Sequence, residues 1–213
     1  MHSNHFNVIR MFLRRSNTFG DSSNLHKTIS KSLSQQQFDL LKKSPKEVVV
    51  TVSNLSLRQV EYKSINNCTY HDFCDWMWLS ANMIPFMSLV TKNNMSYADG
   101  GICNNIPIQV AIDKGATEID VIVLSPEHQT INTKPNKNVF SLTFDIFDLI
   151  MAQLNASKIE YALHQTICTK KEVQIRCYYT PRVLTETPLV FDAEEMSKWW
   201  HEGFKYAQHC LNQ

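Results

Sequence analysis

Apolar and polar residues along the chain follow two periods, one typical of helices and the other typical of strands. Apolar side chains recur every three or four residues in segments that we expect to be amphipathic helices. These segments cover residues 5–15, 25–33, 36–43, 70–83, 108–115, 139–164 and 193–211. Shorter apolar or alternating runs predict strands at residues 47–52, 59–65, 95–98, 118–125 and 172–179. Helices interleaved with strands are typical of an α/β protein.

The first expected strand has a continuous rather than an alternating apolar run, Val48, Val49 and Val50. Continuous β-branched runs are typical of a strand that is covered on both faces, as in a parallel sheet between helices. Residues 59–65 alternate more, so we expect them to pair with this strand or to lie at a sheet edge. The pattern therefore favours a mainly parallel sheet.

Two of the five glycines lie side by side directly after an acid, in Asp99-Gly100-Gly101. Glycine adopts positive φ at little cost, so we expect a sharp turn at the end of the strand at residues 95–98. Pro107 presets a helical φ at the start of the next helix. Asp99 would then stand at a strand end, where ligands and catalytic groups gather in open α/β sheets.

The segments around this turn resemble the C-terminal part of the patatin-like phospholipase domain, over residues 18–126. That family shows a helix ending in Ala-Ser…Ile-Pro, a strand into Asp-Gly-Gly, then Asn-Asn-x-Pro, a helix ending in Gly-Ala and an apolar strand. The corresponding segments here are Ser80-Ala81…Ile84-Pro85, Asp99-Gly100-Gly101, Asn104-Asn105-Ile106-Pro107, Gly115-Ala116 and residues 119–125.

The resemblance implies a fold and an activity. The fold is a three-layer α/β/α domain with a mainly parallel sheet, a single domain over residues 1–213 in which residues 139–213 add a helix, a strand and a helix. The family hydrolyses acyl-lipid esters with a serine–aspartate dyad and needs no metal or cofactor, although some relatives need a protein activator. The aspartate role falls on Asp99, and Gly100 and Gly101 would let the backbone pass close to the serine. Residues that would support the turn are Asn104, Asn105 and Pro107. The substrate would be a phospholipid or another acyl lipid, reached by peripheral membrane contact.

The family's nucleophile sits in Gly-x-Ser-x-Gly, and this sequence contains no such motif. Gly20 is the only glycine before Gly100, so no glycine-rich oxyanion loop is present either. We therefore expect a patatin domain that is truncated or incomplete at its N-terminal side, hydrolysing esters no faster than an Asp99→Asn variant. A second interpretation is a non-catalytic module whose uncovered sheet edge invites self-association or a partner chain.

A third interpretation starts from Gly20-Asp21-Ser22, which looks like the nucleophile block of another serine esterase group. Ser22 would be its nucleophile. That group places the block after an apolar strand and needs a late Asp-x-x-His. Here Arg14-Arg15-Ser16-Asn17 precedes the block, and Asp-x-x-His does not occur. A turn or a helix start is the alternative role for Ser22.

Composition narrows the classes of function. The 213 residues are 43% apolar and 19% charged with a net charge of +1, which fits a globular protein and argues against nucleic acid as a principal partner. No apolar run is long enough to span a bilayer and no secretory leader is evident, so the expected location is the cytoplasm or a compartment that the sequence does not identify. Six scattered cysteines favour free thiols. Cys68, His71 and Cys74 have ligand-like spacing, but no second cluster completes a tetrahedral site, so we expect no metal.

Overall fold

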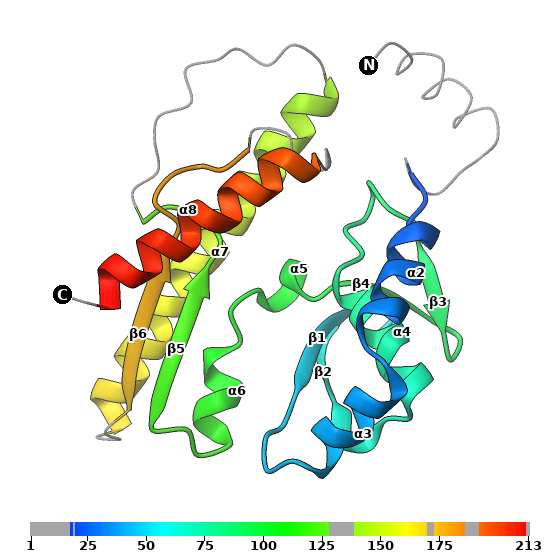
Figure 1. Cartoon of the computed structure of the whole chain (residues 1–213), viewed down its shortest axis with the longest axis horizontal. Helices are drawn as coiled ribbons and strands as arrows, with labels where there is room; N and C mark the ends of the chain where they lie inside the picture. The colour runs from blue at the N-terminus through cyan, green and yellow to red at the C-terminus, as the bar shows by residue number, and fades with distance from the viewer. Residues whose placement is uncertain (1–17, 19, 128–138, 170–172, 186–191, 212–213) are drawn as a thin grey trace. The chain divides into compact units, whose positions relative to one another are not determined.

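A computed structural model describes residues 18, 20–127, 139–169, 173–185 and 192–211. The helix expected at residues 5–15 lies outside the described residues. The chain divides into two compact units, residues 1–107 with 146–158, and residues 108–145 with 159–213 (Figure 1).

The first unit contains a four-stranded sheet. Its strands are β1 (Val49–Asn54), β2 (Gln59–Ser64), β3 (Val90–Lys92) and β4 (Met95–Asp99), in the order β2-β1-β4-β3. All three pairings are antiparallel, so the expectation of a mainly parallel sheet is wrong here. The strand at residues 59–65 does pair with β1 and does lie at an edge, as expected.

Two of the three antiparallel pairings, β1 with β2 and β3 with β4, follow from short connections. Four residues join β1 to β2, and two residues, Asn93 and Asn94, join β3 to β4. Parallel neighbours would require a crossover of a dozen residues or more. Asn93 and Asn94 have φ of 52° and 61°, the left-handed pair that a two-residue hairpin turn favours. The continuous valine run therefore reflects the interior position of β1 in the sheet, not a parallel direction.

Helices pack against this sheet and against one another. They are α2 (Ser23–Ser32), α3 (Gln35–Lys43), η1 (Ile65–Asn67), α4 (Tyr70–Ser80) and α5 (Gly101–Asn104). One buried cluster joins α4 to the sheet and consists of Val52, Trp76, Leu79 and Tyr97. A second joins α3, η1 and α4 through Phe38, Ile65 and Phe73. Thr69 starts α4 by accepting a hydrogen bond from the Asp72 N–H, a normal N-cap.

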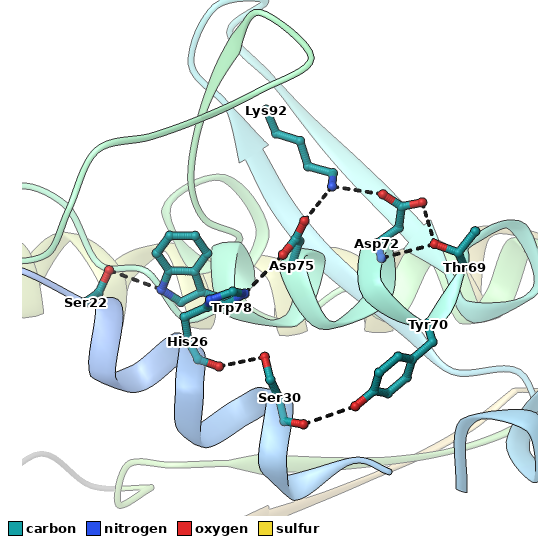
Figure 2. A network of polar contacts seen from close by, with 9 residues as sticks. All are labelled: Ser22, His26, Ser30, Thr69, Tyr70, Asp72, Asp75, Trp78 and Lys92. Carbon is teal, nitrogen blue, oxygen red and sulfur yellow. Dashed lines mark hydrogen bonds and ion pairs between the residues drawn. The ribbon is translucent and has the colours of Figure 1, made fainter. Parts of the chain in front are cut away.

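A network of polar contacts ties α2 and β3 to α4 (Figure 2). Trp78 Nε1 donates to Ser22 Oγ over 3.1 Å, and His26 Nε2 lies 3.1 Å from Asp75 Oδ1. Lys92 of β3 donates to the other Asp75 oxygen, Oδ2, at 2.7 Å. Asp75 thus links a helix that precedes it by about fifty residues to a strand that follows it.

The second unit contains α6 (Ile108–Asp113), β5 (Glu118–Val123), β6 (Gln174–Tyr179) and α8 (Ala193–Leu211). The long helix α7 (Val139–Thr169) contributes residues to both units. Strands β5 and β6 are parallel, and β5 alternates between exposed and buried side chains. The fold is therefore mixed α/β, and within the described residues parallel pairing is confined to β5 and β6.

Helix α8 has the bounds that the sequence predicts, and its expected cap is confirmed. Asp192 Oδ1 accepts from the N–H groups of Glu194 and Glu195, both at 3.0 Å. Trp200 and Phe204 of this helix do not pack in a core, because they are 75% and 58% exposed.

Candidate active site

The candidate site is the end of β4, where the backbone of Asp99 is held on two sides. The Asp99 N–H donates to the Asn82 carbonyl at 3.0 Å, and Ser53 Oγ donates to the Asp99 carbonyl at 2.8 Å. Val52 of β1 is the register partner of Asp99. The carboxylate therefore starts from a fixed strand end, which is the placement that the sequence predicts.

The Asp99 side chain is half-buried. Burial raises the pKa of the Asp99 carboxyl above its ordinary value, and a hydrogen bond from the Gly101 N–H to Oδ1, at 2.7 Å, opposes this only in part. A carboxylate that is poorly solvated holds a proton more tightly than one in water. That is the property which a carboxylate needs to act as a general base near neutral pH.

The two glycines after Asp99 are explained by close contacts and not by the expected positive φ. Gly100 has φ −61° and ψ −27°, which any residue adopts, so the expectation of positive φ is wrong. A Cβ on Gly100 would instead lie 2.1 Å from the Thr51 carbonyl oxygen of β1. A Cβ on Gly101 would lie 3.0 Å from Asp99 Oδ1. Because Gly100 has no Cβ, the turn can pack directly against β1. Because Gly101 has none, its N–H can approach the Asp99 carboxylate.

The residues expected to support the turn lie just beyond it. Asn104 is buried in α5, and its Nδ2 donates to the Tyr62 hydroxyl of β2 at 2.6 Å. Asn105 is the C-cap of α5. Pro107 directly precedes α6, as its fixed φ predicts. The Asn104 contact attaches the turn to the sheet, and it does not involve the Asp99 carboxylate.

Asn82 is a site residue that sequence reasoning did not single out. It is fully buried, its carbonyl accepts from the Asp99 N–H, and its Nδ2 donates to the Ser88 carbonyl. It therefore fixes both the strand end and the loop before β3. The carbonyl contact has no sequence signature, because any residue could supply that oxygen, whereas an asparagine between Ser80-Ala81 and Ile84-Pro85 was visible in the sequence.

A comparison with protein families covers this whole region. A family model described as patatin-like phospholipase matches residues 2–112, just over half of the chain. The chain belongs to the patatin-like phospholipase family. The match includes the four-stranded sheet and the Asp99 turn, and it ends within α6. A search of curated proteins gives no match.

In this patatin-family chain, Ser22 is not placed like an exposed nucleophile. It is 3% exposed, and its hydroxyl oxygen accepts from Trp78 Nε1. Ser22 is the residue that precedes α2, so the helix-start role is the one that the fold supports.

Two further features that the sequence raises, a metal site and a membrane-spanning helix, concern residues away from the Asp99 turn. Cys68, His71 and Cys74 form no ligand cluster with one another, and the described residues contain no group of three ligands that could hold a metal ion. Every helix within the described ranges is too short or too polar to cross a lipid bilayer.

Proposed function

We propose that this chain carries the carboxylate member of a serine–aspartate dyad, with Asp99 as general base in the hydrolysis of acyl-lipid esters. In the first step Asp99 removes the proton of a serine hydroxyl while the serine oxygen attacks the ester carbonyl. The alcohol leaves with a proton and an acyl-enzyme forms. Asp99 then takes a proton from a water molecule that attacks the acyl-enzyme, and the fatty acid is released.

The observation that supports this role best is the environment of the Asp99 carboxyl. Burial raises its pKa, and the Gly101 N–H fixes Oδ1. Among the described residues no hydrogen bond reaches the second oxygen, Oδ2, so its lone pairs are open to accept a proton. Strand β4 and the close approach of Gly100 to Thr51 hold the backbone of Asp99 in place, and this orients its side chain.

The serine is the missing partner, because the sequence has no Gly-x-Ser-x-Gly. We propose that the chain alone hydrolyses a p-nitrophenyl ester no faster than its Asp99→Asn variant. Joined behind a patatin-family segment that carries Gly-x-Ser-x-Gly, the chain should become active. In that fusion, Asp99→Asn should lower kcat by about 10²–10⁴-fold, the usual contribution of a general base.

Asp39→Asn is the matched control, because Asp39 is an exposed acid of α3 in the same unit. It should leave the activity of the fusion unchanged. An active fusion that does not depend on Asp99 would refute the proposal. A fusion that is folded but inactive would favour the non-catalytic interpretation, and activity lost in Ser22→Ala alone would favour the Gly-Asp-Ser esterase.

A further inference from the structure

The second unit contains a cavity of about 650 Å³ between strands β5 and β6, the segment after β6, and helix α8. In Figure 1 the red helix α8 runs alongside these two strands. A volume of this size is within the range of small-molecule sites in proteins. None of its lining residues belongs to the Asp99 turn, so the cavity needs an explanation of its own.

One face of α8 forms a wall of the cavity. Trp199, Gly203 and Tyr206 are spaced by four and then three residues, which places them on one side of a helix. Gly203 lies in the middle of this stripe, and a Cβ added there would meet no atom within 4 Å. A small residue between two aromatic residues therefore leaves open space beside the helix.

The lining is aromatic, with Tyr178 and Tyr179 of β6 in addition to Trp199 and Tyr206 of α8. The faces of aromatic rings carry negative potential and attract cations. Consecutive side chains of a strand point to opposite faces of the sheet, so one of the two tyrosines shares a face with the α8 stripe and the other lies at the cavity's edge.

The charged residues of the lining that the structure describes have one sign. Asp120 and Glu127 line the cavity, and no lysine, arginine or histidine of the described residues does. Arg176 neutralises Asp120 through a bond of 2.6 Å, and no ion pair of Glu127 is found among the described residues. Burial, then the Cys177 thiol and then the Glu127 charge raise the pKa of Tyr179, so the Glu127 carboxylate lies near this tyrosine of the lining.

We propose that this cavity binds an organic cation with an apolar body, of the quaternary-ammonium class. The apolar body would contact the rings of Trp199 and Tyr206, and the positive charge would lie near Glu127. The inference does not depend on the role of Asp99, which belongs to the other unit.

The test is a titration of the full chain with benzyltrimethylammonium, followed by NMR, with benzenesulfonate and benzyl alcohol as anionic and neutral probes of similar size. The cation should bind saturably and at least about fivefold more tightly than either of the other two probes. Trp199→Leu and Glu127→Gln should each weaken its binding by roughly threefold to tenfold. Two control variants should bind as the wild type does, Trp200→Leu on the exposed side of α8 and Glu160→Gln on α7.

Gly203→Leu keeps the test independent of folding defects. Leucine is a better helix former than glycine, so α8 should persist, and its side chain should occupy the cavity. Binding of the cation should fall at least tenfold while the far-UV circular dichroism stays the same. Equal binding of the three probes, no saturable binding of the cation, or unchanged binding in Gly203→Leu would overturn the proposal.

Discussion

Replacing Gly100 with alanine tests why the turn after β4 contains glycine. The new Cβ would lie 2.1 Å from the carbonyl oxygen and 2.4 Å from the carbonyl carbon of Thr51. Both atoms belong to the backbone of β1, an interior strand, so no side-chain rotation can relieve the overlap. The turn must move away from β1 by about 1 Å, which overpacks the site and weakens a strand-end hydrogen bond. We expect a loss of about 3–4 kcal/mol in the free energy of unfolding.

The assay is urea unfolding followed by the fluorescence of Trp76 and Trp78 of α4, of which Trp76 lies in the buried cluster on the sheet. Phenylalanine at positions 199 and 200 removes the signal of α8. A loss of this size lowers the urea midpoint by about 1–4 M. Gly101→Ala is the matched control, because its Cβ would meet only side-chain oxygens at 3.0 Å, and it should cost under about 1 kcal/mol. Equal midpoints for Gly100→Ala and Gly101→Ala would refute the reasoning.

Three further substitutions test the site and its surroundings. Asp99→Asn should raise the melting temperature at pH 7, because a carboxyl whose pKa is raised by burial destabilises the fold when it is ionised. The gain should vanish as the pH falls below 3.8, where Asp99 is protonated in both the folded and the unfolded state; a lower melting temperature at pH 7 would contradict the electrostatic argument. Thr69→Ala removes the N-cap of α4 and should cost about 1 kcal/mol in urea unfolding, so an unchanged midpoint would mean that the cap is not needed. Trp78→Phe leaves the buried Ser22 hydroxyl without its donor and should cost roughly 1–3 kcal/mol. Adding Ser22→Ala to it should recover part of this loss, and strict additivity of the two changes would argue against the bond.

The sequence was most informative where a local signal decides the structure. Helices α3, α6 and α8 start within a residue of their predicted positions, because a capping serine, a proline and a capping aspartate act within one turn. The direction of the strands could not be predicted from such local signals. A continuous valine run reports only burial, and the short connections that force antiparallel pairing matter only once the strand ends are known. Strand β3 was missed because three residues are too few for a period.

The candidate site also has a part that local motifs predict and a part that depends on contacts between distant residues. Asp99 could be proposed from Asp-Gly-Gly and its neighbours, because the order of several motifs resembles one family. The requirement for Gly100 could not be derived, because it depends on the approach of Thr51, a residue about fifty positions earlier that the turn meets only in three dimensions. The buried contacts of Asn82 could not be derived either, because they also depend on the three-dimensional fold.

The most direct test of the central claim is an NMR titration of the Asp99 carboxyl carbon in the intact chain, assigned by comparison with Asp99→Asn. The account predicts a pKa above the ordinary value of 3.8, because the carboxyl is buried at the end of β4 and only one N–H group stabilises its charge. A pKa at or below 3.8 would show a well-solvated carboxylate and would contradict the role of Asp99 as a general base.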